Sequence, residues 1–348
     1  MGDEHKMALD RASGCANLAE GADELPAGVS LFHGQYRVGA FLNSGGFGLT
    51  YLAQDRLGRD VVLKECFVPA FSQRSQTRVL PRPDSNPDHL EKVMHSFQNE
   101  ALVLARLSHP NIVHVHQVFE DNDTAYMALD YIKGHDLLEI VDEGKARLTP
   151  AQIVTMARKL ISAVAHVHDR QLLHCDISPD NVCVRADGEP VLIDFGSARS
   201  SAQGAAGRHT GFSMVKDGYS PPELYRTDGP CGPHSDIYAL GATLYHAISG
   251  TAPADAQSRF LCSVDGKADP LRPLAGRFPD YPPGFLESID RAMAVQPAAR
   301  HASALGWLRL LTPVDTRPET RPEPRPVRNV MQMAWNNAPA DQPVARHA

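Results

Sequence analysis

The sequence predicts an α+β fold, in which β-strands occupy the first part and α-helices the second. Strand-like apolar runs separated by turns fill most of residues 36–132 and are interrupted by one helical stretch. From residue 149 onward, apolar residues recur instead at helical spacing. Strands and helices that are segregated along the chain in this way are typical of the α+β class.

The composition is that of a globular protein with a substantial core, since 43% of the 348 residues are hydrophobic. The net charge of −7 argues against a protein that coats nucleic acid or anionic lipid. No apolar run reaches the roughly 18 residues of a membrane span, and the charged N-terminus does not resemble a signal peptide. The six cysteines are scattered without a C-x-x-C pair, which predicts reduced thiols in a cytosolic setting. A secreted effector delivered by a dedicated machine would look the same.

A glycine-rich turn joins the first two expected strands, in residues 36–55. Backbone amides in such a turn can approach phosphate oxygens, because no Cβ blocks them. A third strand-like run, in residues 59–67, carries Lys64 about fifteen residues after the turn. Together the turn and the lysine favour a phosphate-binding site.

The other segments of the first part alternate between loop, helix and strand signals. Residues 68–88 are rich in Pro, Ser and Arg and predict a long loop. Residues 89–110 follow helical spacing, with Glu100 beside the apolar stripe. Two more strands are expected in residues 109–120 and 124–132.

Three polar residues stand between short apolar runs in the middle of the chain: Asp176, Asn181 and Asp194. Residues 182–185 and 191–193 predict a hairpin that holds Asn181 at its entrance and Asp194 at its exit. Their oxygens form a hard-ligand site suited to magnesium. Asp176 lies outside this pair and is free to accept a proton. Each of these short motifs alone is typical of a turn, but their order within one short window favours a phosphoryl-transfer site.

This window resembles the protein-kinase family, in which H-R-D-x-x-x-x-N is followed by D-F-G. The segments GGFGLTYLA, VVLKE, HPNIV, HCDISPDN and YSPPE are similar to those of bacterial eukaryotic-like serine/threonine kinases. The resemblance implies a two-lobed α+β protein-kinase-like fold. Its N-lobe, about residues 31–132, would be an antiparallel sheet with one helix, and its C-lobe, about 133–312, mostly helical. Residues 1–30 would form a flexible segment, and the Pro/Arg-rich residues 313–348 a disordered tail, either solvated or available to a partner.

The resemblance also implies roles for individual residues. Asp176 would accept the proton of the substrate hydroxyl, Lys64 held by Glu100 would orient ATP, and Asn181 and Asp194 would bind Mg²⁺. The residues expected around the nucleotide come from the glycine turn, the following strands, the inter-lobe connection and the ribose site. They are Leu42, Asn43, Gly45, Gly46, Phe47, Gly48, Thr50, Val62, Lys64, Leu129, Asp130, Ile132 and Asp136.

Three residues in the second half match structural positions of the family. Glu223, in the P-P-E segment, and Arg300 would form an ion pair. Asp236 begins an apolar helix, as does the buried aspartate that fixes the catalytic loop in the family. These matches extend the resemblance from about Tyr36 to Leu311.

Two catalytic-loop positions depart from the family. Cys175 replaces the arginine of H-R-D, so activity is expected not to depend on a phosphorylated activation loop. Ser178 replaces a lysine that contacts the transferring phosphate, and Lys216 is expected to supply this cation from the other side of the site.

These residues predict an ATP- and Mg²⁺-dependent serine/threonine protein kinase that acts on a protein hydroxyl and also on itself. Two alternatives remain from the sequence. One is a pseudokinase that binds ATP as a scaffold, which the substitutions at Cys175, Ser178 and Asn43 favour. The other is a small-molecule kinase with the same core fold, against which the P-P-E segment and its arginine argue.

Overall fold

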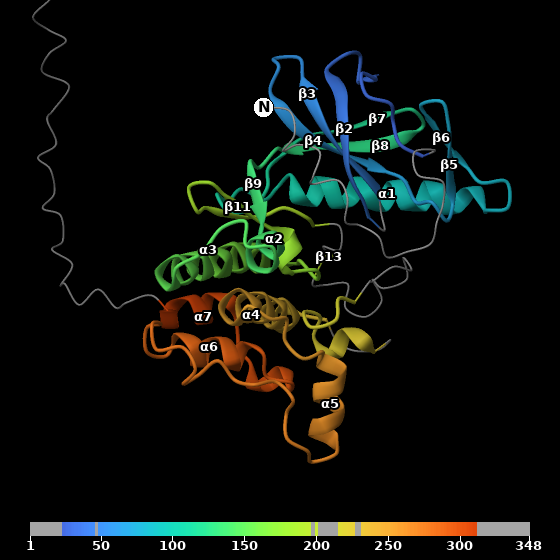
Figure 1. Ribbon diagram of the computed structural model, residues 1–348. Coiled ribbons are helices and arrows are strands. Elements are labelled where there is room, and N and C mark those ends of the chain that lie inside the picture. The colour runs from blue at the N-terminus through green and yellow to red at the C-terminus, as the bar shows by residue number, and fades with distance from the viewer. Residues whose placement is uncertain (1–22, 46–47, 196–198, 201–214, 227–230, 312–348) are drawn as a thin grey trace, which may run out of the picture. The chain divides into compact units, whose positions relative to one another are not determined.

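The structure is a computed structural model that describes residues 23–45, 48–195, 199–200, 215–226 and 231–311 (Figure 1). These residues belong to one compact unit. The predictions for Gly46, Phe47 and the Pro/Arg-rich tail lie outside the described residues. None of the helices described is long and apolar enough to cross a membrane.

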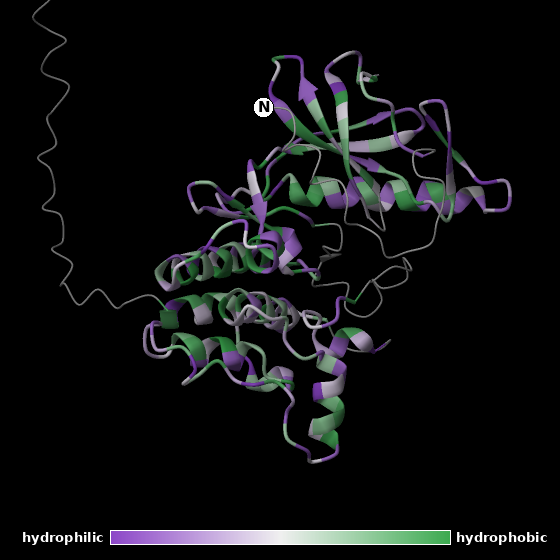
Figure 2. Cartoon of the chain, viewed as in Figure 1, coloured by the Kyte–Doolittle hydropathy of each residue, from purple (hydrophilic) through white to green (hydrophobic). Residues whose placement is uncertain are grey.

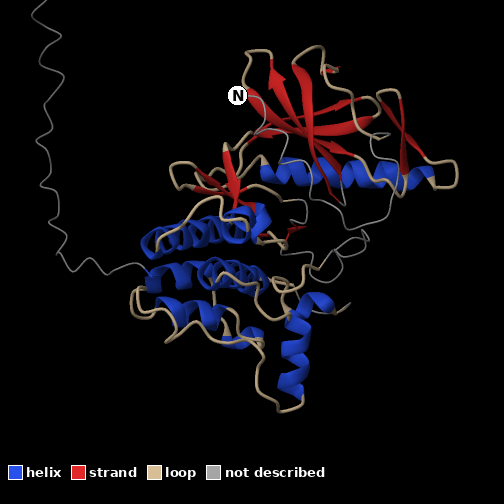
Figure 3. Ribbon diagram, in the orientation of Figure 1, coloured by secondary structure: helices blue, strands red, loops and turns tan. Residues whose placement is uncertain are grey.

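The N-lobe is an antiparallel sheet of six strands in the order β1-β2-β3-β4-β8-β7. Figure 3 shows the strands gathered in this part of the molecule and most helices in the other part. The strands are β1 (Ser30–Leu31), β2 (Tyr36–Gly45), β3 (Gly48–Asp55), β4 (Asp60–Cys66), β7 (Val115–Asp121) and β8 (Thr124–Asp130). The expected strands are therefore confirmed, except that the one expected over residues 109–120 begins only at Val115.

The side chains of β4 alternate between two environments, because successive residues of a strand point to opposite faces of the sheet. Val61 and Leu63 are buried in the outer core of the N-lobe. Val62 and Lys64 point to the opposite face, where Val62 packs against the core shared with the C-lobe. The strand thereby turns Lys64 toward the region between the lobes.

One helix, α1 (Pro87–Leu104), covers the sheet and contacts β4, β7 and β8 (Figure 1). It begins where Asn86 Oδ1 accepts a hydrogen bond from the Asp88 amide at 3.0 Å and proline occupies the first turn. Phe97, Ala101 and Leu104 face the core, so the predicted apolar stripe is confirmed.

The predicted long loop of residues 68–88 is wrong, because it contains the hairpin of β5 (Ser72–Ser75) and β6 (Arg78–Pro81). These strands carry polar residues without apolar alternation, so periodicity does not reveal them. An ion pair to the preceding strand holds them instead: Arg74 of β5 pairs with Glu65 of β4.

The expectation of a flexible segment over residues 1–30 is wrong for its described part, residues 23–30, which packs on the N-lobe. Leu25 is 4% exposed within the N-lobe core, and its amide donates a hydrogen bond to the Tyr51 hydroxyl at 3.1 Å. The strand β1 then pairs with β2. Residues 1–22 lie outside the described part of the chain.

The C-lobe is built around two long helices, α3 (Pro150–Asp169) and α4 (Pro233–Ser249). The predicted start of α3 is confirmed, since the Thr149 hydroxyl accepts the Gln152 amide at 3.3 Å. Hydrophobic residues of both helices, green in Figure 2, make the centre of the lobe. The remaining helices are α2 (Leu137–Asp142), α5 (Ala256–Val264), α6 (Phe285–Ala292) and α7 (Ala304–Leu311), with 3-10 turns at Pro179–Asn181, Pro222–Tyr225 and Pro297–Ala299.

A small sheet lies next to the helices and contains the predicted hairpin. Its strands, in the order β12-β11-β9, are β12 (Pro190–Leu192), β11 (Val182–Arg185) and β9 (Gly134–Asp136). A further pair joins β10 (Leu172–Leu173) to β13 (Arg199–Ser200). The α+β architecture with a sheet-rich N-lobe and a helical C-lobe is thus confirmed.

Candidate active site

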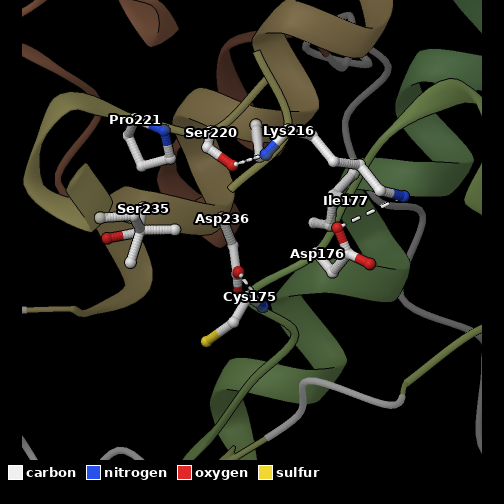
Figure 4. Close-up of a pocket in the computed structure, with 10 residues that line it drawn as sticks. Cys175, Asp176, Ile177, Lys216, Ser220, Pro221, Ser235 and Asp236 are labelled. Carbon is white, nitrogen blue, oxygen red and sulfur yellow. Dashed lines mark hydrogen bonds and ion pairs between the residues drawn. The ribbon is translucent and has the colours of Figure 1, made fainter. Parts of the chain in front are cut away.

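A buried carboxylate, that of Asp236 at the start of α4, fixes the loop that carries Asp176 (Figure 4). Its Oδ2 accepts hydrogen bonds from the His174 amide at 2.9 Å and His168 Nε2 at 2.8 Å, and its Oδ1 accepts one from the Cys175 amide at 2.8 Å. Burial raises the pKa of Asp236, but these donors outweigh burial and leave the pKa below its usual value. The structure therefore contains the predicted interaction between Asp236 and the loop.

Cys175 adopts a left-handed backbone conformation, with φ at 64°. Such a conformation in a non-glycine residue costs about 1–3 kcal/mol and persists only where the surroundings impose it. Here the bond from the Cys175 amide to Asp236 supplies that constraint. The next residue, Asp176, is therefore presented at a fixed position.

Asp176 is partly buried and held by Asn181, whose Nδ2 donates to the Asp176 carbonyl at 2.8 Å and to its Oδ2 at 3.0 Å. Burial raises the pKa of Asp176 to about 6, against the lowering effect of the Lys216 ammonium. A carboxylate with this pKa is ionised at neutral pH and is a better proton acceptor than an ordinary aspartate.

Lys216 approaches the catalytic loop from the segment that precedes Pro221 (Figure 4). Its Nζ donates to Ser178 Oγ at 2.9 Å and to Asp180 Oδ2 at 2.8 Å, and lies 3.4 Å from Asp176 Oδ1. Its amide donates to Ser220 Oγ at 2.9 Å, which fixes the backbone of this segment. The structure thus brings Lys216 next to the serine, as expected, while its role in transfer stays a prediction.

Asp180 is a contact that the sequence reasoning missed. It shares the Lys216 ammonium with Ser178 and Asp176. The sequence could have indicated this contact. A lysine placed against this loop needs an acidic partner besides Asp176, and Asp180 is the nearby carboxylate in the loop.

Lys64 pairs with Asp194, with 2.7 Å between Nζ and Oδ1. Burial lowers the pKa of Lys64, but Asp194 and then Glu100 raise it, and the net pKa lies above its ordinary value. The side chains come from β4 in the N-lobe and from the end of the β11–β12 hairpin. This ion pair therefore connects the two lobes.

The expected ion pair between Lys64 and Glu100 is not formed. Among the described residues, Lys64 makes an ion pair within 4 Å with Asp194 alone. Glu100 lies half-buried on α1, and burial raises its pKa to about 7 although Lys64 opposes the rise. The Asp194 side chain, which is 42% exposed, is the partner that the ammonium contacts in this arrangement.

The backbone brings Asn181 and the residue before Asp194 together, because the Ile193 amide donates to the Asn181 carbonyl at 3.1 Å. The amide nitrogen of Asn181 is directed to Asp176, so Oδ1 is its acceptor for another group. One carboxylate and one amide oxygen fit Mg²⁺, which commonly takes its remaining ligands from water and phosphate.

Most of the described residues that are expected around the nucleotide lie on strands of the N-lobe. Asn43 pairs with Thr50 and Gly45 with Gly48 in the β2–β3 hairpin, and Leu42 is 44% exposed on β2. On neighbouring strands Val62 pairs with Leu129, which is 6% exposed. Asp130 ends β8, and Ile132 follows it.

Two of these residues also have roles in the fold itself. A Cβ at Gly48 would lie 2.1 Å from the Glu65 carbonyl oxygen, so the close approach of β3 to β4 requires glycine there. Asp136 caps α2 by accepting the Glu139 amide at 2.7 Å, and burial raises its pKa. Contact of Asp136 with a ribose stays a prediction.

Glu223 and Arg300 form the buried ion pair that the sequence predicts. The guanidinium donates to both carboxylate oxygens, at 2.7 and 3.0 Å, and Arg300 is 2% exposed. Burial raises the pKa of Glu223, but Arg300 outweighs burial and the pKa lies below its usual value. Such bidentate pairs fix geometry, and this one anchors the segment that follows Lys216.

Comparison with known proteins gives one family. The description "Protein kinase domain" matches residues 36–271 of the chain. PrkC of Bacillus subtilis, a serine/threonine-protein kinase, is 29% identical over 273 residues, which are 78% of this chain and 39% of PrkC. The serine/threonine-protein kinases PknL and PknA of Mycobacterium tuberculosis are 29% and 30% identical over 83% and 79% of this chain and 67% and 60% of their own lengths. A solved structure described as the apo form of PpkA-294 aligns with a TM-score of 0.69 and 32% identity, covering 83% of this chain and all of that one.

Proposed function

Because the chain belongs to the protein kinase family, we propose that it is a serine/threonine protein kinase that transfers the γ-phosphate of ATP to a protein hydroxyl, including hydroxyls of its own chain. The observation that carries this proposal is the surroundings of Asp176. Its loop is fixed through Asp236, its pKa is about 6, and a lysine lies 3.4 Å away. A scaffold that only binds ATP has no need of this arrangement.

Asp176 is the group that orients the substrate hydroxyl and receives its proton. Proton transfer to a positioned side chain contributes about 10²–10⁴-fold to a rate. Asn181 holds the carboxylate by donating to Oδ2 at 3.0 Å, which leaves Oδ1 on the side that Lys216 approaches. The proton acceptor is therefore oriented before a substrate arrives.

Lys64, Asp194 and Asn181 form the part of the site that holds the triphosphate. Lys64 supplies a positive charge from β4, and Asp194 and Asn181 supply oxygens of the kind that Mg²⁺ prefers. When bound, Mg²⁺ neutralises charge on the phosphates. The Lys64–Asp194 pair has to loosen for both groups to take these ligands, which gives Glu100 on α1 access to the freed ammonium.

Lys216 takes the position of the cation that the loop lacks at Ser178. Its ammonium is shared between Ser178, Asp180 and Asp176, all on the catalytic loop. A cation next to the proton acceptor stabilises charge that develops on the transferring phosphoryl group. We assign Lys216 to this role.

The test is incubation of the purified protein and a generic protein substrate with labelled ATP and Mg²⁺. Asp176→Asn is expected to lower transfer by about 10²–10⁴-fold while nucleotide binding and the unfolding midpoint stay close to the parent values. Asp169→Asn is the matched control, because that carboxylate is 83% exposed at the end of α3. Nucleotide binding without label transfer in the parent protein would establish a scaffold, and label on small molecules alone would establish a small-molecule kinase.

A further inference from the structure

Two cysteines that are far apart in the sequence meet beside the catalytic loop. Cys175 Sγ lies 3.5 Å from Cys231 Sγ, although 56 positions separate the residues. Cys175 is 8% exposed and directly precedes Asp176, whereas Cys231 is partly exposed in the segment that leads into α4. Figure 4 shows the Cys175 sulfur on the side of the loop away from the Asp176 carboxylate.

We propose that Cys175 and Cys231 form a reversible disulfide that inactivates the site. The bond needs a sulfur separation of about 2.05 Å, so the two sulfur atoms have to approach by roughly 1.5 Å. Cys231 is partly exposed and precedes the N-cap of α4, so rotation of its side chain can supply this movement. The Cys175 backbone is held by Asp236 and supplies less.

The other described cysteines lie elsewhere. Cys66 is fully buried, and Cys183 is 6% exposed with its thiol directed to the Ile132 carbonyl at 3.7 Å. Cys262 lies on α5. Within the described part of the chain, Cys175 and Cys231 are the pair whose sulfur atoms are in contact.

The oxidant class that fits is a low-molecular-weight disulfide such as oxidised glutathione. The Cys231 thiolate, which solvent reaches, attacks one sulfur of that disulfide, forms a mixed disulfide and releases one thiol. Cys175 then loses its proton and attacks the Cys231 sulfur, which releases the second thiol. The two protein thiols are oxidised, and the small disulfide is reduced to two thiols.

The expected consequence follows from the position of Cys175. Its amide donates to Asp236 and its φ is 64°. A disulfide that displaces the Cys175 side chain would therefore strain this constrained backbone. Asp176 is the next residue and depends on that arrangement for its contacts with Asn181 and Lys216. Misplacement of a reacting group by about 1 Å can cost about 10²-fold in rate.

The experiment treats the full chain with oxidised glutathione and examines it by peptide mass spectrometry without reduction. We expect a peptide pair that joins Cys175 to Cys231, a fall in transfer of about 10²-fold, and recovery of both after dithiothreitol. Cys231→Ser should form no such pair and keep its activity under oxidation. Cys262→Ser is the matched control, a partly exposed cysteine outside the site, and should respond as the parent does.

Three results would overturn the inference: no joined peptide, a Cys231 that stays bound to glutathione, or a joined peptide with unchanged transfer. The effect on transfer rests on the proposed function, whereas the joined peptide does not. A chain that forms the disulfide but transfers no phosphate when reduced would refute the proposed function. A chain that transfers phosphate equally before and after oxidation would refute the switch alone.

Discussion

Lys216 controls the protonation of Asp176 as well as the charge beside it. Burial raises the pKa of Asp176, and Lys216 is the largest of the influences that lower it. The result is a pKa of about 6, high enough for proton transfer and low enough for ionisation at neutral pH. Under the proposed function, one lysine would serve both the proton acceptor and the phosphate in a loop that carries Ser178.

Lys216→Ala is expected to shift the acidic limb of the pH profile upward and to lower kcat. Asp176 must be ionised to accept a proton, so the parent kcat/KM should fall as pH drops through about 6. Without the ammonium the pKa of Asp176 rises, and the fall begins at higher pH. Steady-state kinetics between about pH 5 and 8 measure the shift. Lys216→Arg keeps the charge and is the control, and superimposable limbs for the alanine variant and the parent would contradict the assignment.

Cys175, the residue before Asp176, is expected to remove one mode of regulation. An arginine at this position can pair with a phosphorylated activation-loop residue, and Cys175 has no cation to offer. The loop is held instead by Asp236, through bonds to the His174 and Cys175 amides at 2.9 and 2.8 Å. Activity should therefore depend on Asp236 rather than on a phosphate.

Treatment with a phosphatase should leave the rate of the kinase on an added substrate unchanged. Intact-mass measurement before and after treatment shows that phosphate was removed, and initial rates with labelled ATP give the activity. Cys175→Arg provides the contrast, because it supplies the cation that a phosphate would need. If dephosphorylation lowered the activity of the parent, another basic group would have to pair with the phosphate.

At the scale of elements, a buried charge network attaches the β5–β6 hairpin to the catalytic strand β4. Glu65 is fully buried and accepts hydrogen bonds from Arg74 on both oxygens, from the Tyr51 hydroxyl at 3.0 Å and from the Tyr126 hydroxyl at 2.6 Å. Glu65 is the neighbour of Lys64 on the opposite face of β4. The network thus fixes the strand that positions Lys64, the lysine proposed to bind ATP.

Removing one partner of such a pair leaves the other buried and uncompensated. Arg74→Ala is expected to lower the free energy of unfolding by about 3–5 kcal/mol, as measured by urea denaturation. Arg78→Ala, in the same hairpin, removes an exposed pair with Asp123 and should leave the midpoint unchanged. Equal effects of the two substitutions would mean that the hairpin, rather than the charge network, carries the stability.

The elements that could be predicted from the sequence are those defined by residues close together in the chain. The β11–β12 hairpin has a turn and two apolar runs within a dozen residues, and α3 has its cap and proline in adjacent positions, so both follow from the sequence. The β5–β6 hairpin depends on Arg74 reaching Glu65, and Cys175 meets Cys231 only through the fold. Lys216 could be identified only through the resemblance to protein kinases, because no rule of sequence spacing relates it to Ser178. Contacts that depend on tertiary structure leave no periodic trace.

At the scale of the molecule, one hydrophobic core runs from α1 and β8 of the N-lobe to α3 and α4 of the C-lobe, and the polar site lies at its edge. It includes Phe97 and Met127 as well as Leu160 and Leu240. The Lys64–Asp194 pair adds a polar link between the same lobes. Because both groups are expected to turn to nucleotide and metal, ligand binding replaces this link with stronger ones.

Mg²⁺ and a non-hydrolysable ATP analogue should therefore stabilise the chain against heat. At a ligand concentration of about 100 times Kd the gain is about 2.7 kcal/mol, which corresponds to a rise in Tm of the order of 5 °C for a domain of this size. Asp194→Asn should lose the part of the rise that depends on Mg²⁺, each variant being compared with its own ligand-free Tm. Asp187→Asn, an exposed carboxylate in the turn of the same hairpin, is the control and should keep the full rise. If Asp194→Asn retained a magnesium-dependent rise equal to that of the parent, other residues would hold the metal. Ligand binding would then not replace the Lys64–Asp194 ion pair between the lobes.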